Sequence, residues 1–484
     1  MNSIRLADFV KSYDVRGLVP EQLSTVVARA IGRSFAEQVA LAEGADTVVI
    51  GHDMRPSSPE LVAAFADGLR AQGVNALLIG LCSTDGLYYA SGTLDLPGAM
   101  FTASHNPAEY NGIKLCRAGA RPISTDNGLA QVRDRAQEWL DDREPPAVEC
   151  PGTVTERDVL VEYAALLRGL VDLSGIKPLK VVVDAGNGMG GYTVPAVLGT
   201  GGGLPRLPLD ICELFFELDG TFPNHPANPL EPANLVDLQA AVCAQGADLG
   251  LAFDGDADRC FVVDELGNPV SASAVTALVA VREIQRAVAD GTPVADIKVV
   301  HNLISSRAVP EMIVEHGASA VRTRVGHSFI KSDMAQNAAV FGGEHSAHYY
   351  FKDFWYADTG MLAAMHVLAA LGVDDRPLSQ IMRKYSRYSA SGEVNSTVHD
   401  KEAATSRVRE WALAQDGVAE DTLDGSTFTH EQAGDSPMWW LNVRGSNTEP
   451  LLRLNVEAAD DATMTALRDE ALSLIRRIDE SETR

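Results

Sequence analysis

Three segments of the chain share one hydrophobic pattern, in which a run rich in β-branched residues leads into a polar or glycine-rich turn. They begin at Thr47 (TVVIGHDMRPSS), Lys180 (KVVVDAGNGMGG) and Lys298 (KVVHNLISS), and a helical pattern follows each of them. Apolar runs of this kind are typical of parallel strands that are buried on both faces. The pattern predicts one α/β fold used three times, although a few similar residues do not establish a sequence repeat.

The C-terminal part of the chain follows a different pattern. Two strand-like runs, WWLNV at 439–443 and LLRLNVEA at 451–458, lie on either side of a polar turn, and a helix-like run follows them. This order predicts a smaller α+β domain that begins after Gly372. The charged, proline-bearing stretch at 141–152 predicts a linker between the first two units.

The size and charge of the chain limit its possible partners. At 484 residues it is long enough for about three or four domains. Its 66 acidic and 40 basic side chains give a formal net charge of -26, which argues against a nucleic-acid or anionic-membrane surface. An anionic ligand would therefore need a local group of cationic side chains.

No segment of the sequence has the pattern of a membrane span or of a signal peptide for export. The N-terminal residues lack the apolar core of a signal peptide, and the longest apolar stretch, at 361–373, is too short to cross a bilayer. The cysteines form no C-x-x-C pair, which fits reduced thiols better than disulfides or a zinc site. They are Cys82, Cys116, Cys150, Cys212, Cys243 and Cys260. We expect a soluble, cytoplasmic protein.

The TASHNP loop at 102–107 follows an apolar run and has groups that suit a ligand. Ser104, at the end of a predicted strand, can present its hydroxyl, and His105 is near enough in sequence to share the site. An ordinary turn is the alternative, because Ser, Asn and Pro are favoured in turns.

The FDGDADR loop places Asp254, Asp256 and Asp258 at alternating positions between two apolar runs. Carboxylates so close repel one another unless a hard divalent cation lies between them, and oxygen ligands suit Mg²⁺ or Ca²⁺. Together with Glu265 the aspartates match an EF-hand calcium loop, but Arg259 stands where that motif requires glycine. The flanking runs also read as strands, so we expect Mg²⁺; a solvated acidic loop is the alternative.

Two further loops carry groups suited to a sugar and to a phosphate. GGEHSAHYYF, from Gly342, offers acid, hydroxyl and imidazole groups to sugar hydroxyls, although a polar loop is ordinary. RGSNTEPLLRL is a predicted turn between two strands, where Arg444 and Arg453 with nearby hydroxyl and backbone N–H groups can converge on a phosphate. A plain hairpin turn is the alternative, but in so acidic a chain the local arginines favour an anion site.

Taken together and in this order, these loops resemble those of the α-D-phosphohexomutase family, and the third looks most like its phosphomannomutase/phosphoglucomutase branch. YDVRG at 13–17 completes the set. The resemblance covers nearly the whole chain and implies an α/β fold, with three similar α/β domains with mixed sheets plus a smaller C-terminal α+β domain, arranged around a central cleft. We place the domains, with their phosphoserine, metal, sugar-recognition and phosphate-binding loops in turn, at 1–148, 152–259, 260–372 and 375–484.

The resemblance also implies roles for single residues. Ser104 matches a serine that carries a phosphoryl group, and with a phosphoserine oxygen the metal ligands of one Mg²⁺ per chain would be Ser104, Asp254, Asp256 and Asp258. The residues expected around the transferring group are Arg16, His105, Lys114 and Arg259. The expected substrate contacts are Glu344, Ser346, His327, Lys331, Arg444, Ser446, Asn447 and Thr448.

By this resemblance the chain is an isomerase that interconverts hexose 1-phosphate and hexose 6-phosphate through a phosphoserine and a 1,6-bisphosphate, with hexose 1,6-bisphosphate as primer. Mannose and glucose phosphates are the expected substrates. Glucosamine phosphate is an alternative, because the GEHSAH loop departs from a GEMSGH-like pattern at His345 and Ala347. Lys114 or His105 is the expected general acid or base. The bisphosphate has to turn between two transfers, so we expect the fourth domain to close on substrate and to open partly during turnover.

Two other functions stay open from the residues alone. An aspartyl phosphatase would use Asp254 and Asp256 as a D-x-D pair and would keep its activity in Ser104→Ala. A calcium-dependent sugar-binding protein would leave the TASHNP loop without a role. The expected partner is a small phosphosugar, with no nucleic acid and no membrane, and the oligomeric state is left open.

Overall fold

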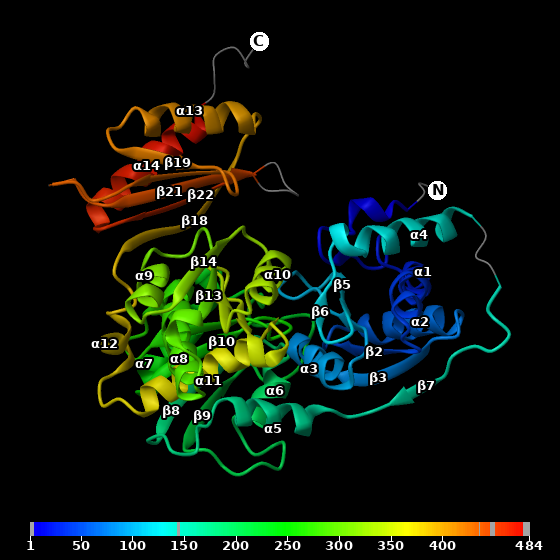
Figure 1. Cartoon of the computed structure of the whole chain (residues 1–484). Helices are drawn as coiled ribbons and strands as arrows, with labels where there is room; N and C mark the ends of the chain where they lie inside the picture. The colour runs from blue at the N-terminus through cyan, green and yellow to red at the C-terminus, as the bar shows by residue number, and fades with distance from the viewer. Residues whose placement is uncertain (1–3, 143–145, 435, 446–450, 478–484) are drawn as a thin grey trace.

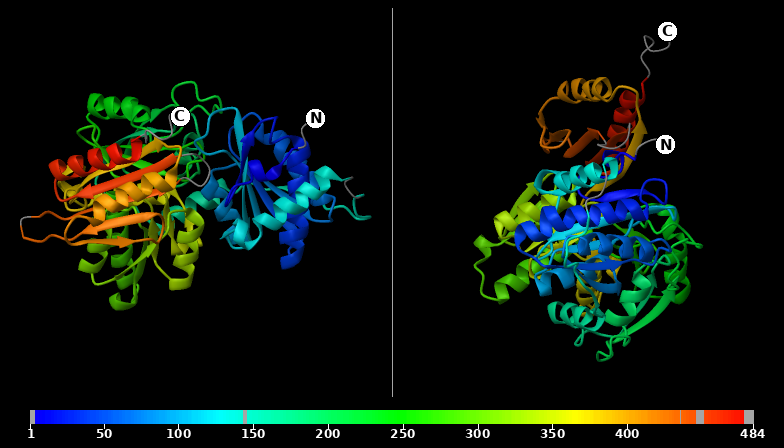
Figure 2. Two further views of the ribbon diagram at one scale, coloured as in Figure 1. Left: turned by 90° about the horizontal axis from the view of Figure 1, so that it is seen from above. Right: turned by 90° about the vertical axis from the view of Figure 1, so that its right-hand side faces the viewer.

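The computed structural model describes residues 4–142, 146–434, 436–445 and 451–477. Within these ranges the chain forms four sheets with helices packed against them (Figure 1). We call each sheet, with the helices packed against it, a unit. Figure 2 shows the first unit, in blue, beside the green second and third units, and the orange to red fourth unit above the third. No helix in the described ranges is long and apolar enough to cross a membrane.

The first sheet is mixed, with the order β1-β5-β4-β2-β3-β7 and β6 paired to β5. β2 runs parallel to β3 and β4, whereas β5 is antiparallel to both β4 and β1. Its strands are β1 (Val15–Leu18), β2 (Thr47–His52), β3 (Asn75–Leu81), β4 (Gly98–Phe101), β5 (Tyr110–Arg117), β6 (Arg121–Pro122) and β7 (Val154–Glu156). Its helices are η1 (Leu6–Asp8), α1 (Thr25–Phe35), η2 (Ala36–Ala40), η3 (Leu41–Glu43), α2 (Ser58–Arg70), α3 (Thr84–Leu94), η4 (Thr125–Asn127) and α4 (Leu129–Asp141).

The second sheet has the order β12-β11-β10-β8-β9. Its strands are β8 (Leu179–Asp184), β9 (Leu209–Leu214), β10 (Leu249–Phe253), β11 (Cys260–Asp264) and β12 (Pro269–Val270), and its helices are α5 (Leu160–Leu170), α6 (Gly190–Val197), η5 (Pro232–Leu235) and α7 (Val236–Gln245). β10 and β11 are antiparallel, so the FDGDADR loop is the turn of a hairpin. Strand pairing therefore continues across the domain boundary that we expected after residue 259.

The third sheet has the order β14-β13-β15-β16-β17. Its strands are β13 (Lys298–Asn302), β14 (Ser319–Thr323), β15 (Phe341–Gly343), β16 (Tyr349–Phe351) and β17 (Ala357–Asp358). Its helices are α8 (Ala272–Ala289), η6 (Val294–Asp296), α9 (Ala308–Glu315), α10 (His327–Asn337), η7 (Lys352–Phe354), α11 (Gly360–Gly372) and α12 (Leu378–Met382). The apolar stretch that the sequence marks at 361–373 is the buried helix α11, packed beside α8.

The fourth sheet is antiparallel, with the order β18-β22-β21-β20-β19. Its strands are β18 (Ser389–Thr397), β19 (Val418–Asp421), β20 (Ser426–His430), β21 (Trp439–Gly445) and β22 (Leu451–Ala458), and its helices are α13 (Lys401–Leu413) and α14 (Asp461–Arg476). The smaller α+β domain expected from the sequence is thus confirmed, with its two predicted strands paired as β21 and β22.

The three predicted strand–turn–helix units are also confirmed. Each predicted strand, β2, β8 and β13, lies inside its sheet with a parallel neighbour on both sides, and the next helices along the chain are α2, α6 and α9. Parallel strands covered on both faces bury their side chains on both faces, which explains why these runs are continuously apolar.

The hydrophobic core explains how the units are held together. One large cluster of buried side chains reaches from Val49 in the first sheet through Val183 in the second to Val299 in the third. The fourth unit has a core of its own, and only a small cluster, from Leu303 to Trp440, joins it to the third. The first three units therefore form one packed body that carries the fourth.

Candidate active site

Ser104 lies directly after β4 in a loop that fixes its hydroxyl. The residue is 4% exposed and has a left-handed φ of 49°. Its backbone N–H donates to Thr102 Oγ1 at 2.9 Å, its hydroxyl donates to Asp254 Oδ2 at 2.8 Å, and the same Oγ lies 3.1 Å from His105 Nδ1. The serine of the first unit is therefore in direct contact with the acidic loop of the second.

The acidic loop brings three buried carboxylates together. Asp254, Asp256 and Asp258 each offer an oxygen within 4.8 Å of the others. Lys114 Nζ, from β5, donates to Asp256 at 2.7 Å and to Asp258 at 2.6 Å. Asp256 Oδ1 and Asp258 Oδ1 are buried, and neither has a hydrogen-bond partner among the described residues. Two orphaned carboxylate oxygens in an all-oxygen set fit a hard cation such as Mg²⁺.

Burial and neighbouring charges shift the pKa values of the acidic loop. Burial raises the pKa of Asp254 to about 7, against the opposing charge of Arg259. Burial also acts to raise the pKa of Asp256, but the Lys114 ammonium and the hydroxyl of Thr84 outweigh it and hold that pKa below its usual value. Burial acts to lower the pKa of Lys114, but Asp256 and Asp258 hold it well above its usual value. Lys114 is therefore a charged donor at neutral pH.

His105, unlike Lys114, is uncharged at neutral pH. Burial and the neighbouring Arg259 charge hold the pKa of His105 well below its usual value, so its ring is neutral at neutral pH. Arg259 Nη2 donates to His105 Nδ1 at 2.7 Å, and Arg259 Nε donates to Asp254 Oδ2 at 2.9 Å. Arg16, on β1, donates to Asn106 Oδ1 at 2.8 Å and so reaches the same loop as Ser104. All four residues expected around the transferring group thus lie at the serine loop or at the acidic loop that it contacts.

The third loop joins the site as the turn between β15 and β16. Glu344 is 2% exposed, and its carboxylate accepts from Tyr350 Oη at 2.6 Å and from the Gly326 N–H at 3.2 Å. Ser346 Oγ lies 2.9 Å from His348 Nδ1, and the backbone of His348 forms an isolated β-bridge with Arg259. The sugar-recognition loop is thus attached to the acidic loop through its backbone.

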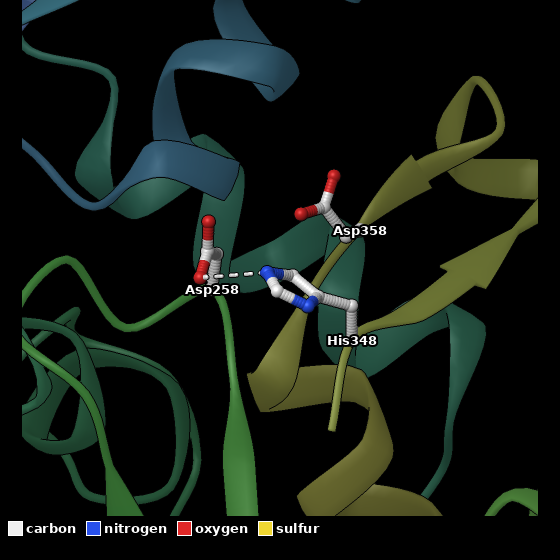
Figure 3. Close-up of side chains that lie close together, drawn as sticks. All are labelled: Asp258, His348 and Asp358. Atoms are coloured by element: carbon white, nitrogen blue, oxygen red, sulfur yellow. Dashed lines mark ion pairs between the residues drawn. The ribbon is translucent and has the colours of Figure 1, made fainter. Parts of the chain in front are cut away.

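A second group of possible metal ligands lies beside this bridge. Asp258, His348 and Asp358 turn toward one another (Figure 3), and His348 Nε2 lies 3.8 Å from Asp258 Oδ1. Lys331 Nζ lies 2.5 Å from Asp358 Oδ1 and 4.1 Å from the centroid of the Tyr88 ring, and Lys331 is 2% exposed. A buried ammonium therefore already supplies a cation to Asp358. Lys331 therefore lies beside the group formed by Asp258, His348 and Asp358.

The expected phosphate-binding loop is described only in part. Arg444 is 8% exposed and forms an ion pair with Glu393, which also lies 3.5 Å from Arg453. Arg444 and Arg453 are cross-strand partners on β21 and β22. The charges of Glu393 and Arg444 act on the pKa of His345, which burial lowers. Ser446, Asn447 and Thr448 lie outside the described residues, as does the side chain of His327 at the start of α10.

The calcium-loop alternative fails on geometry. Glu265, which would close an EF-hand loop, accepts from the backbone N–H of Ser379 at 3.0 Å and from its hydroxyl at 2.5 Å. The acidic loop lies between two strands, not between two helices. Glu265 is thus held at α12 by Ser379, so the four acidic side chains do not form an EF-hand.

Sequence reasoning missed two residues that hold the site in place. Thr84 begins α3, its hydroxyl donates to Asp256 Oδ2 at 2.6 Å and its N–H donates to the Asp256 carbonyl at 3.0 Å. Arg55, after β2, donates to the carbonyl oxygen of Ser104 at 2.9 Å. The only signal for Thr84 is the Ser-Thr-Asp start of a helix, which indicates a cap and not a metal site. Nothing in the sequence indicates that Arg55 reaches the serine loop.

Models of four domains from one family match the chain in order. They are described as phosphoglucomutase/phosphomannomutase alpha/beta/alpha domain I at residues 8–141, domain II at 162–267, domain III at 273–388, and the C-terminal domain at 393–474. Together these matches cover most of the chain and all four of its sheets.

Similar proteins carry related names. A protein of Xanthomonas campestris called "Phosphohexose mutases" is 40% identical over 470 residues, which cover 96% of this chain and 98% of that protein. A phosphomannomutase of Escherichia coli (strain K12) is 36% identical over 464 residues, which cover 96% and 97%. A crystal structure from Burkholderia thailandensis, of a phosphoglucomutase/phosphomannomutase family protein, has a TM-score of 0.83 at 30% identity and covers 98% of both chains. The chain therefore belongs to the phosphoglucomutase/phosphomannomutase family of mutases.

Proposed function

We propose that this chain is a phosphohexomutase that interconverts hexose 1-phosphates and hexose 6-phosphates of mannose and glucose, with Ser104 as the residue that carries the phosphoryl group. The observation that supports this most strongly is the position of Ser104 Oγ, 2.8 Å from Asp254 Oδ2 at the edge of three buried carboxylates. A phosphate monoester transfers its phosphoryl group very slowly in water, so charge neutralisation and positioning have to come from the protein.

The reaction consists of two transfers that are the reverse of each other. In the first, the bond between phosphorus and Ser104 Oγ breaks, a bond forms from that phosphorus to the free sugar hydroxyl, and the hydroxyl proton ends on Ser104 Oγ. The product is a hexose 1,6-bisphosphate. After it turns, its other phosphoryl group bonds to Ser104 Oγ, and the serine proton ends on the sugar oxygen. A hexose 1,6-bisphosphate therefore serves as primer for the unphosphorylated enzyme.

Proton transfer has two candidates with different charges. His105 Nδ1 lies 3.1 Å from Ser104 Oγ and is neutral at neutral pH, so it can accept a proton. Lys114 is charged and donates to Asp256 and Asp258, and because its pKa is held well above its usual value it suits charge neutralisation better than proton donation. We propose that His105 carries the proton between the sugar hydroxyl and Ser104 Oγ once Arg259 releases Nδ1 to bind a phosphoryl oxygen, with Arg16 and Lys114 as further donors to the phosphoryl oxygens.

The residues that would hold Mg²⁺ are Asp254, Asp256 and Asp258, with an oxygen of phosphorylated Ser104 as a further ligand. Such an ion would neutralise charge on the serine oxygen as the phosphoryl group leaves. The orphaned Asp256 Oδ1 and Asp258 Oδ1 support this assignment.

Sugar and distal phosphate have separate contacts in the proposal. Glu344, held by Tyr350, and Ser346 bind sugar hydroxyls, while Arg444 with Ser446, Asn447 and Thr448 binds the phosphate that is not transferred. His327 and Lys331 remain proposed substrate contacts, and the Lys331 ammonium is paired with Asp358. A small phosphosugar is therefore the proposed partner. The cytoplasm is the proposed location, a choice supported by six unpaired cysteines.

The test is a coupled assay of mannose 1-phosphate, glucose 1-phosphate and glucosamine 1-phosphate side by side, with Mg²⁺ and a bisphosphate primer. We expect turnover of the first two and none in Ser104→Ala. Turnover of glucosamine 1-phosphate above both others would assign the alternative substrate. Release of inorganic phosphate by Ser104→Ala would favour the aspartyl phosphatase, and sugar binding without any phosphate exchange would favour a binding protein.

A further inference from the structure

Arg55 is a fully buried arginine that packs against the backbone of the Ser104 loop. It is 1% exposed. Its Nη1 donates to the carbonyl oxygens of Pro107 and Tyr110, both at 2.8 Å, and its Nη2 donates to those of Ser104 at 2.9 Å and Asn106 at 2.7 Å. One guanidinium thus binds four carbonyl groups of the segment that carries the nucleophile. Hydrogen bonds from a charged donor are each stronger than neutral ones, and together they fix the path of this segment.

A carboxylate fixes the direction of the guanidinium. Asp53 Oδ2 lies 3.2 Å from Arg55 Nε, and Asp53 Oδ1 accepts from the Arg55 N–H at 3.0 Å and from Ser58 Oγ at 2.9 Å. Both side chains of the pair are 0% exposed. All the donor nitrogens of Arg55 are therefore engaged, and the guanidinium plane has no freedom to rotate.

The hydrogen bonds from the Arg55 guanidinium matter most for the backbone of Ser104. This residue has a φ of 49°, a left-handed conformation that is strained for a residue other than glycine. Its carbonyl accepts from Arg55 Nη2, and a Cβ placed on Gly255 of the acidic loop would lie 2.3 Å from the same oxygen. The carbonyl of the nucleophile is thus held between the arginine of one unit and the metal loop of the next.

Arg55 also contacts the second unit directly. Its guanidinium lies 5.1 Å from the centroid of the Phe222 ring, and a Cβ placed on Gly220 would lie 2.7 Å from Arg55 Cα. The residue therefore lies where the serine loop of the first unit meets the unit that carries the three aspartates.

We propose that Arg55 is a positioning residue that sets the distance between Ser104 Oγ and the carboxylates of the acidic loop. It acts through the loop backbone and touches neither sugar nor phosphate. The inference rests on the proposed function, because it assigns a catalytic consequence to the place of Ser104. Substitution of Arg55 lowers the rate of phosphoryl transfer. It leaves the affinity for the sugar phosphate nearly unchanged, because Glu344 and the fourth unit provide that affinity.

The experiment compares Arg55→Lys with Arg168→Lys in the full-length protein with Mg²⁺. Arg168 is a matched control, because its guanidinium also binds backbone carbonyls, those of Val197, Gly199 and Pro205, but lies in the second unit away from Ser104. The readouts are the melting temperature, kcat and KM for mannose 1-phosphate, and the rate at which glucose 1,6-bisphosphate phosphorylates Ser104, followed by intact mass.

For Arg55→Lys we expect kcat and the phosphorylation rate to fall about 100-fold, with KM within about twofold of the unsubstituted protein. Arg168→Lys is expected to lose thermal stability and to keep both rates. Equal phosphorylation rates in Arg55→Lys and the unsubstituted protein would overturn the inference. An unsubstituted protein that takes no phosphate on Ser104 would instead overturn the proposed function.

A second variant covers the case in which Arg55→Lys does not fold. Asp53→Asn keeps the arginine and its four carbonyl contacts but removes the charge that fixes Nε. We expect an intermediate fall in kcat with KM unchanged. A folded Asp53→Asn protein with the kcat of the unsubstituted enzyme would contradict the positioning role.

Discussion

At the scale of single residues, the position of the nucleophile depends on very close contacts between backbone groups. Ser104 belongs to the first unit and Gly255 to the acidic loop of the second, and a Cβ on Gly255 would lie 2.3 Å from the Ser104 carbonyl oxygen. Glycine at this position lets the two loops approach each other. The same approach brings Ser104 Oγ to 2.8 Å from Asp254.

Gly255→Ala therefore tests this contact. The added methyl group has to separate the serine loop from the acidic loop, so we expect kcat to fall about 100-fold. Gly169→Ala is the control, because a Cβ at that helical position meets nothing within 4 Å. Steady-state kinetics of both variants, at equal folded fraction, check the expectation, and an unchanged kcat in Gly255→Ala would contradict it.

A second residue-scale prediction concerns Asp85, which burial gives a pKa of about 6. Hydroxyl groups of Ser83 and Tyr163 donate to this carboxylate. In the unfolded chain an aspartate has a pKa of about 3.9, so the folded state binds the proton of Asp85 more tightly and stability falls as pH rises from about 4 to 6. The full penalty is present above pH 6 and amounts to at most about 3 kcal/mol.

Asp85→Asn removes this titration. Relative to the unsubstituted protein, the urea midpoint of the variant should therefore be higher at pH 7.5 than at pH 4.5, whatever its absolute value. Urea unfolding of both proteins with EDTA at the two pH values measures the change. A difference between the two midpoints that stays constant with pH would refute the assignment.

Individual residues also show which parts of this site the sequence can predict. Ser104 and the aspartates of the acidic loop were predictable because each group lies within one short motif whose chemistry is local. Arg55 and Thr84 were not predictable. Arg55 binds a backbone carbonyl group and Thr84 binds a carboxylate of another unit, and neither kind of contact produces a sequence motif. The role of Lys331 as a substrate contact stays a prediction, because the structure shows only that its ammonium is paired with Asp358.

At the scale of elements, hairpins present the functional loops. The turn of β10 and β11 carries the aspartates, and the turn of β15 and β16 carries Glu344. The apolar runs on either side of the acidic loop made β10 and β11 predictable, whereas β15 and β16, which fall largely within a stretch that we expected to be a loop, were not. The pairing partners of the strands were not predictable either. β7 joins the first sheet after the expected linker, and β11 stays with the second sheet, because pairing between distant strands depends on packing that a local pattern does not record.

Strand β16 offers a matched pair of variants. Tyr350 Oη donates to Glu344 at 2.6 Å, whereas the buried Tyr349 hydroxyl has no hydrogen-bond partner among the described residues. Tyr350→Phe should raise KM for mannose 1-phosphate about tenfold, because a lost hydrogen bond to a charged group costs about 1.5–3 kcal/mol. Tyr349→Phe should leave KM unchanged. Equal KM values for the two variants would show that Tyr350 does not orient Glu344.

At the scale of the whole molecule, the fourth unit is attached differently from the others. The first unit has a core of its own but also shares one large cluster with the second and third, whereas the fourth has its own core and meets the third through a small apolar cluster and ion pairs. These pairs include Arg322 with Asp421 at 2.5 Å and Arg307 with Glu431 at 2.7 Å. Side chains in such pairs are partly exposed, so they can exchange partners at low cost.

This attachment predicts a domain movement. A bisphosphate has to turn between two transfers, so the fourth unit should close when substrate binds and open partly during turnover. Small-angle X-ray scattering with and without glucose 1,6-bisphosphate should show a smaller radius of gyration for the bound Ser104→Ala protein. Identical scattering curves at saturating ligand would exclude the movement.

The central claim is that one phosphoryl group resides on Ser104 between turnovers. Intact and peptide mass spectrometry of the full-length protein, after incubation with glucose 1,6-bisphosphate and Mg²⁺, measures this directly. We predict one added phosphoryl group, located on Ser104, which disappears on exposure to mannose 1-phosphate and is never gained by Ser104→Ala. A phosphoryl group on Asp254 or Asp256, or full mutase activity in Ser104→Ala, would contradict it.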